Sequence, residues 1–147
     1  MRVSDRDLAA LQAALNGDVA AFDHYNAELR GTPGAGFTAL MATAFIDAAR
    51  HRFGDERSIS DVIRFVGKVR TQYSAYDLRP SVAEEMIFSV LRGTPTQTGL
   101  DGRECGDIQI TLLAALVDNL DIRQRASLFQ RARLEADQWL AKASLAT

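Results

Sequence analysis

Residues 108–120, which read IQITLLAALVDNL, constrain the fold more than any other stretch of the chain. Nine of these thirteen residues are apolar. Arranged as a helix, they would cover most of its circumference, and a helix that is apolar on most sides is a buried one. The stretch is too short to cross a bilayer, which takes about 20 apolar residues. We therefore expect a central buried helix against which other helices lay their apolar faces.

Six further segments carry apolar residues at steps of three and four, as amphipathic helices do. They run from about residue 5 to 16, 18 to 30, 37 to 53, 59 to 73, 81 to 92 and 121 to 143. No segment alternates with period two for long enough to predict a strand. At 147 residues the chain has the length of one ordinary domain. The sequence thus predicts an all-α fold over residues 1–147, a single-domain bundle of about seven helices around the buried helix 108–120.

Several details of these helices are specific enough to check. In the fourth segment the inward-facing residues are expected to be Ile59, Val62, Ile63, Val66, Val69 and Tyr73. In the last segment they are expected to be Ile122, Ala126, Phe129, Ala132, Ala136, Trp139, Leu140 and Ala143. Ser4 with Asp7, and Ser81 with Glu84, have the spacing of capping boxes. Gly67 lies inside a helical segment, which suggests that a neighbouring backbone approaches it closely.

The 14 residues 93–106, GTPTQTGLDGRECG, contain four glycines and no helical period. They predict a long loop that ends where Asp107 caps the central helix. A connection of this length inside a compact domain is uncommon, and such loops are often functional. Arg103, Glu104 and Cys105 are the groups in it that would contact a ligand.

Charge and cysteine content indicate the class of protein and its compartment. The formal net charge is -2 and the pI is about 5.7, so no overall attraction to nucleic acid or to anionic lipid is expected. Cys105 is the single cysteine and therefore forms no internal disulfide. Met1 is not followed by the charged and then apolar run of a signal peptide. We expect a cytoplasmic protein without membrane association.

Three patterns come close to a nucleotide, metal or catalytic site. Residues 31–38, GTPGAGFT, have the spacing of a Walker A loop, but Phe37 stands where the phosphate-binding lysine belongs. Residues 101–112 begin like a calcium loop, but Leu112 stands where a bidentate glutamate is needed. The side chains best suited to nucleophilic or metal chemistry lie far apart in the sequence: His24, His51 and Cys105. We therefore expect no catalytic residue, no cofactor and no metal.

Two basic stretches are candidates for contacts with an anion or a charged partner. Arg64 and Lys68 share one face of the fourth expected helix, and Arg123 and Arg125 begin the last one. Arginines in a first turn meet the positive end of the helix dipole, so an acid such as Asp121 or an external anion has to compensate. A solvated charged face is the simpler interpretation of both stretches.

The sequence argues against nucleic acid as the main partner. Residues 11–25 resemble the start of bacterial sigma factors, but nothing downstream predicts a promoter-melting helix or a helix-turn-helix. The fourth and fifth helices are joined by a turn, yet Glu84 and Glu85 at the start of the presumed reading helix would face phosphate with like charge. Weak binding through the arginine patches is kept as an alternative.

Protein–protein interaction is the leading functional hypothesis. Phe53, Phe65, Phe88 and Leu128 fall off the faces assigned to the core or at their margins, and together they would form an apolar patch that marks an interface. We expect a small cytosolic, non-catalytic helical protein that binds a protein partner and self-associates as a homo-oligomer. The first alternative is a small-molecule-binding or enzymatic domain with a pocket near the loop 93–106.

Overall fold

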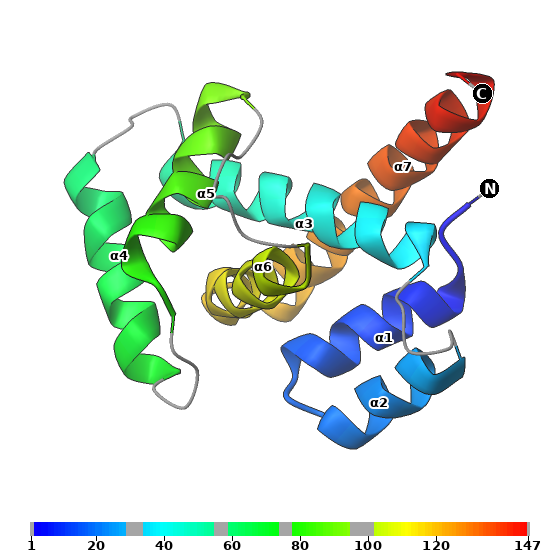
Figure 1. Ribbon diagram of the computed structural model, residues 1–147, viewed down its shortest axis with the longest axis horizontal. Coiled ribbons are helices and arrows are strands. Elements are labelled where there is room, and N and C mark those ends of the chain that lie inside the picture. The colour runs from blue at the N-terminus through cyan, green and yellow to red at the C-terminus, as the bar shows by residue number, and fades with distance from the viewer. Residues whose placement is uncertain (1, 29–33, 55–58, 74–77, 95–101, 147) are drawn as a thin grey trace. The chain divides into compact units, whose positions relative to one another are not determined.

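The computed structural model describes residues 2–28, 34–54, 59–73, 78–94 and 102–146. Within these ranges the chain forms seven helices and no strand (Figure 1). The helices are α1 (Asp5–Leu15), α2 (Val19–Glu28), α3 (Ala35–Phe53), α4 (Ile59–Gln72), α5 (Pro80–Arg92), α6 (Gly102–Asp118) and α7 (Ile122–Ala146). The all-α prediction is confirmed.

Contacts between Cα atoms divide the chain into two compact units. The first unit contains Met1–Ala44 and Leu120–Thr147, and the second contains Phe45–Asn119. The first unit therefore holds α1, α2, the N-terminal half of α3 and α7, whereas the second holds the rest of α3 with α4, α5 and α6. The chain passes from one unit to the other inside α3 and again after Asn119.

Helix α6 is the buried helix of the second unit. Residues 112–117 are six consecutive buried residues, and at about 100° per residue they cover the whole circumference of the helix. Helices α4 and α5 pack against α6 and against each other. The predicted buried helix is confirmed, although it comprises Gly102–Asp118 rather than 108–120.

The early start of α6 corrects the predicted loop 93–106. Residues 102–107 are helical, so Asp107 lies inside the helix and does not cap it. Its main-chain carbonyl accepts a hydrogen bond of 2.8 Å from the Thr111 hydroxyl one turn later. Residues 95–101 of the expected loop lie outside the described residues.

Glycine content explains why this part of α6 was expected to be a loop. Gly102 and Gly106 each disfavour a helix by about 1 kcal/mol relative to alanine. Glu104 lies in the first turn of α6, where a carboxylate interacts favourably with the helix dipole. The apolar residues that follow are buried, and the free energy of that burial outweighs the weak local preference.

Helix α4 buries a face that is rotated from the predicted stripe. Its buried residues are Val62, Phe65, Val66 and Val69. Ile59 and Ile63 were expected inside but are 65% and 49% exposed. The rotation brings Phe65 edge-on to Phe53 of α3, with ring centroids 5.5 Å apart and ring planes at 82°. A phenylalanine ring buries a large apolar area and gains from this edge-to-face contact, so its packing decides which face of α4 turns inward.

Two other local predictions for the second unit are wrong. Pro80 is the first residue of α5 and Arg79 is its N-cap, so the capping box of Ser81 with Glu84 does not form. Proline is preorganised for the first helical position, and the helix therefore starts before Ser81 can cap it. Among the described residues, no atom lies within 4 Å of a Cβ built on Gly67, so no neighbouring backbone approaches that glycine.

In the first unit, α1 and α2 pack together as a helical hairpin. The capping box at the start of α1 is confirmed, because the Ser4 hydroxyl accepts the Asp7 N–H at 3.1 Å and the Asp7 carboxylate accepts the Ser4 N–H at 3.0 Å. The rings of Phe22 in α2 and Phe37 in α3 lie 6.0 Å apart between centroids. These aromatic side chains connect the hairpin to the N-terminal half of α3.

The buried face of α7 consists of Leu128, Phe129, Ala132, Ala136 and Leu140. Four residues predicted to face inward are instead exposed: Ile122, Ala126, Trp139 and Ala143. Ile122, at 87% exposed, lies at one end of the helix, and residues 141–145 at the other end are all exposed. Both ends of the predicted stripe therefore reach solvent.

Candidate interaction surface

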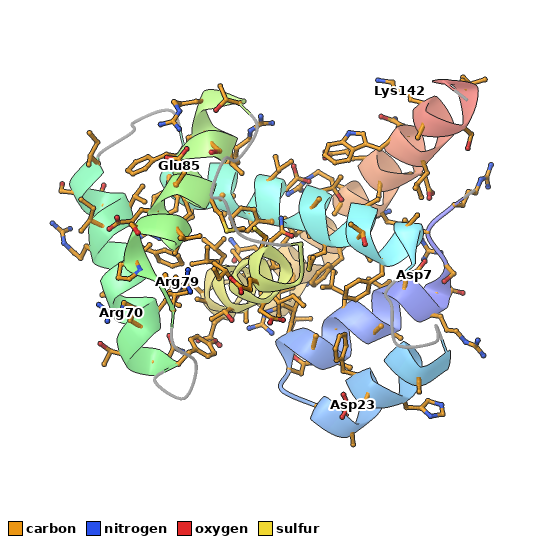
Figure 2. All side chains as sticks on the ribbon, in the orientation of Figure 1. Asp7, Asp23, Arg70, Arg79, Glu85 and Lys142 are labelled. Carbon is orange, nitrogen blue, oxygen red and sulfur yellow. The ribbon has the colours of Figure 1, made fainter. Side chains whose placement is uncertain are left out.

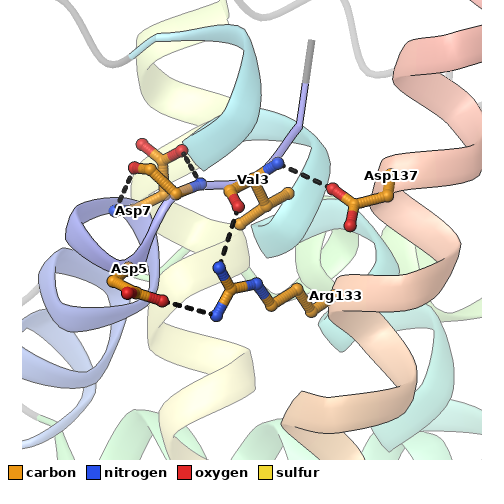
Figure 3. Close-up of polar contacts among 6 residues, drawn as sticks. Val3, Asp5, Asp7, Arg133 and Asp137 are labelled. Carbon is orange, nitrogen blue, oxygen red and sulfur yellow. Dashed lines mark hydrogen bonds and ion pairs between the residues drawn. The ribbon is translucent and has the colours of Figure 1, made fainter.

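The N-terminal segment of the chain is bound along one side of α7 (Figure 3). The main-chain N–H of Val3 donates to the Asp137 carboxylate at 2.7 Å, and the Val3 carbonyl accepts from the Arg133 guanidinium at 3.0 Å. Arg133 also forms an ion pair of 2.9 Å with Asp5 at the start of α1. The Val3 side chain is buried. Both main-chain polar groups of Val3 therefore have partners on α7.

The start of α3 packs tightly against the same segment. A Cβ built on Gly36 would overlap the Asp7 carboxylate and would lie 3.6 Å from the Val3 Cα. The Asp7 carboxylate cannot turn away freely, because it accepts the Ser4 N–H of the α1 capping box. These contacts, together with a hydrogen bond from Thr43 of α3 to the Ala132 carbonyl, fix the rotation of α7 about its own axis.

The rotation leaves one line of α7 side chains facing away from the core. It consists of Leu134, Gln138, Ala141 and Leu145, which we call the α7 stripe, and all four are exposed. At about 100° per residue they fall within about 60° of the helix circumference. Leu134 is 60% exposed and Leu145 is 88% exposed. Two leucines are thus presented to solvent on one face of α7.

The spacing of the stripe is that of a short coiled-coil seam. Its steps of four, three and four place Leu134 and Ala141 at d positions and Gln138 and Leu145 at a positions of a heptad repeat. One heptad earlier, the corresponding positions hold Ser127 and Arg131, whose side chains are joined by a hydrogen bond of 2.8 Å. The apolar part of the seam is therefore confined to the C-terminal half of α7, where Lys142 also lies (Figure 2).

The sequence prediction of a surface patch was wrong in its residues. Phe53, Phe65 and Leu128 are buried in the structure, and Phe88 is half-buried. Phe53 and Phe65 contact each other in the second unit, and Leu128 belongs to the buried face of α7. Phe53, Phe65 and Leu128 are therefore additional core residues, buried alongside the neighbours that had been assigned to the core.

The predicted basic contacts are exposed or interact with residues close to them in the sequence. Arg64 forms an exposed ion pair of 3.3 Å with Asp61 one turn earlier, and such pairs contribute at most about 1 kcal/mol. Lys68, on the same helix, is exposed. Arg123 is exposed at the start of α7, and Arg125 donates to the Leu120 carbonyl at 3.3 Å.

A shallow depression lies at the start of α7. It is lined by Leu120, Asp121, Ile122, Arg123 and Arg125. The predicted compensation by an acid is present there, because the Asp121 carboxylate accepts the Gln124 N–H at 2.7 Å and the Gln124 side chain accepts the Asp121 N–H at 3.0 Å. The helix end is therefore capped by its own residues, which reduces its attraction for an external anion.

The expected ligand loop is part of a helix. Arg103, Glu104 and Cys105 all lie in the first turns of α6, where Glu104 is exposed and Cys105 is half-buried. Within the residues that the structure describes, no group of three or more His, Cys, Asp or Glu side chains could hold a metal ion, and no helix is long and apolar enough to span a membrane.

One ionisable side chain in the second unit has a shifted pKa. Partial burial raises the pKa of the Tyr73 hydroxyl above 10.0, and the nearby negative charge of Asp118 raises it further. Gln72, next to Tyr73, lies 3.5 Å from the Asp118 carboxylate, at the limit of a hydrogen bond. Both effects disfavour the phenolate, so the hydroxyl stays protonated at neutral pH.

Comparison with protein-family models, with curated proteins and with solved structures gives no match to this chain. Function is therefore inferred from the surface itself. Sequence reasoning missed the α7 stripe because the core-facing residues of α7 were assigned as one continuous face. The sequence signal that could have identified the stripe was the heptad spacing of Leu134, Gln138, Ala141 and Leu145.

Proposed function

We propose that this chain is a non-catalytic, cytoplasmic interaction protein that self-associates through the α7 stripe. The observation that supports the proposal is the pair of strongly exposed leucines, Leu134 and Leu145, on one face of α7. Exposed apolar side chains that gather on one face of a structured element mark interaction sites more often than scattered ones do. Cys105 is the single cysteine of the chain, which fits a reducing compartment.

The size of the stripe sets the strength of the association. Burial of an exposed leucine contributes about 1.5–3 kcal/mol, so the four leucines of a dimer would contribute roughly 6–12 kcal/mol. Association opposes this with about 4–15 kcal/mol of lost translational and rotational freedom. The two contributions are similar in magnitude, and a contact of about three turns is below the usual size of stable interfaces. We therefore propose a weak, reversible complex that forms at micromolar concentrations or above.

Sedimentation equilibrium of the full chain between about 1 µM and 1 mM tests the proposal. The expected result is a weight-average mass that rises reversibly from 16.1 kDa toward a small multiple of it. A mass of 16.1 kDa at every concentration would refute self-association. The measurement should be repeated at high salt, because an apolar interface persists in salt whereas non-specific charge attraction is screened.

The structure offers less support for the two alternative functions. A pocket near residues 93–106 requires a loop there, and α6 occupies 102–106. Nucleic-acid binding through arginine patches requires side chains gathered toward phosphate, whereas Arg64 pairs with Asp61 and Arg125 donates to the Leu120 carbonyl. Interaction with protein is therefore the function that we propose.

A further inference from the structure

We infer that the partner on the α7 stripe is a second copy of this chain, docked antiparallel in one specific register. In that register Leu134 packs beside Leu145 of the second copy, and Gln138 packs beside Ala141 of the second copy. The inference rests on the proposed self-association and adds to it the orientation and the register. It follows from the spacing of the stripe, from the side-chain sizes within it and from the charges beside it.

The spacing of the stripe is self-complementary. In an antiparallel helix pair, a residue at an a position packs in the same layer as a d residue of the other helix. The residue numbers of the two members of each layer then add to a constant, and both 134 with 145 and 138 with 141 add to 279. A single twofold axis therefore generates every layer of the seam, as a closed, isologous dimer requires.

The sizes of the side chains distinguish this arrangement from a parallel one. A parallel pair would place Gln138 against Gln138 in one layer and Ala141 against Ala141 in the next. The first layer would be crowded with polar groups, and the second would leave a void. The antiparallel register puts one large and one small side chain in each central layer, which is how closely packed helices fill space.

Charge complementarity at the edge of the stripe favours the same arrangement. Glu135 and Lys142 follow the two d residues directly, so both occupy e positions on the same side of the seam. In the antiparallel register each e residue lies beside an e residue of the other helix, and Glu135 meets Lys142 of the second copy twice in the dimer.

The last turns of α7 are accessible for this contact. Residues 141–145 are all exposed, so none of them packs in the core of its own unit. The seam from Leu134 to Leu145 spans 11 residue steps, or about 16 Å along the helix axis. This length makes the orientation measurable, because two copies of one stripe residue lie close together in a parallel pair and about 16 Å apart in the antiparallel one.

Disulfide trapping between differently tagged full-length chains tests the register. In a Cys105→Ser background, a chain with Leu134→Cys is mixed with a chain carrying Leu145→Cys and oxidised gently. The antiparallel dimer places the two new thiols in one layer and keeps the intact Leu134–Leu145 layer at the other end. We expect the yield of the mixed disulfide to exceed the yield of either disulfide between two copies of one variant by at least about tenfold, because a disulfide forms only between closely spaced thiols.

A control mixture replaces the Leu145→Cys chain with one carrying Ile59→Cys, because Ile59 is exposed and lies outside the α7 stripe. Mixed disulfide at the same rate in the control would show random collision and would overturn the inference. A predominance of the 134–134 and 145–145 products would show a parallel pair and would also overturn it. If the chain sediments as a dimer but the mixed product does not form, only the register is wrong. If the chain sediments as a monomer, the proposed function itself fails.

Discussion

The Thr43 hydroxyl of α3 donates a hydrogen bond of 2.8 Å to the Ala132 carbonyl of α7, and both residues are fully buried. The same hydroxyl lies within 3.1 Å of two carbonyls of its own helix, those of Ala39 and Leu40. It therefore has an intrahelical alternative, and the bond to Ala132 is the one that links two elements. This link fixes which face of α7 turns inward and, as a consequence, which face carries the stripe.

Replacing Thr43 by valine keeps the shape of the side chain and removes the hydroxyl. We expect the free energy of unfolding to fall by about 0.5–1.5 kcal/mol, the usual net contribution of one hydrogen bond. Urea titration followed by circular dichroism measures the change. Thr38→Val, at an exposed position of the same helix, is the matched control and should change stability by less than about 0.5 kcal/mol. An equal loss in both variants would show that the bond to Ala132 is not what stabilises the contact.

Truncation of Leu116 tests the burial of α6. Leu116→Ala should lower the free energy of unfolding by about 2–5 kcal/mol, because it removes buried methyl groups and leaves a cavity. Leu134→Ala makes the same chemical change at an exposed site of α7, and in dilute, monomeric protein it should cost less than about 0.5 kcal/mol. A loss below about 1 kcal/mol for Leu116→Ala would contradict the position of α6 in the core.

Two glycine substitutions should act in opposite directions. Gly36→Ala places a methyl group against the Asp7 carboxylate, so the capping box of α1 has to open, and we expect a loss of about 1 kcal/mol or more. Gly67→Ala fills open space inside α4 and should increase stability by about 0.5–1 kcal/mol. Thermal unfolding of the two variants beside the unchanged chain gives both signs. A stabilising Gly36→Ala would disprove the tight packing at the start of α3.

Stability at alkaline pH should depend on Tyr73. Its pKa is raised in the folded chain, so the unfolded chain loses this proton first as the pH rises. The free energy of unfolding should therefore begin to fall as the pH passes about 10, the ordinary pKa of tyrosine, and should keep falling until the folded pKa is reached. Urea titrations between pH 8 and 11 measure this slope.

Tyr73→Phe should make the fall of the unfolding free energy with pH shallower in that range. Asp118→Asn should lower the pKa of Tyr73 because it removes a neighbouring negative charge. The phenolate absorbance of Asp118→Asn reports the second effect. Identical slopes with tyrosine and phenylalanine at position 73 would show that the environment described for this hydroxyl is incorrect.

The sequence predicted the fold well because helix periodicity is a strong local signal. All seven helices and the buried helix α6 follow from apolar spacing alone. The face that each helix buries was harder to predict, because it depends on which partner lies opposite. In α4, contact with Phe53 turned Phe65 inward and left Ile59 and Ile63 exposed. No feature within the α4 segment itself contains that information.

The interaction surface was missed for a related reason. The residues chosen from the sequence were large side chains at the margins of the expected stripes, and three of the four proved to be core. The α7 stripe consists of side chains that are left over after Ala132 and Ala136 pack inward. Its position depends on long-range contacts such as those of Val3 with Arg133 and Asp137, so the heptad spacing alone did not identify it as the exposed face.

Sedimentation velocity of a charged double variant is the decisive test of self-association through the α7 stripe. Leu134→Glu with Leu145→Glu puts four carboxylates into the proposed seam of a dimer, whereas Ile59→Glu with Ile63→Glu makes the same change on the exposed edge of α4. We predict that the α7 variant stays at 16.1 kDa at concentrations where the unchanged chain and the α4 variant associate, with the helical circular dichroism of all three alike. Association of the α7 variant equal to that of the unchanged chain would contradict the account.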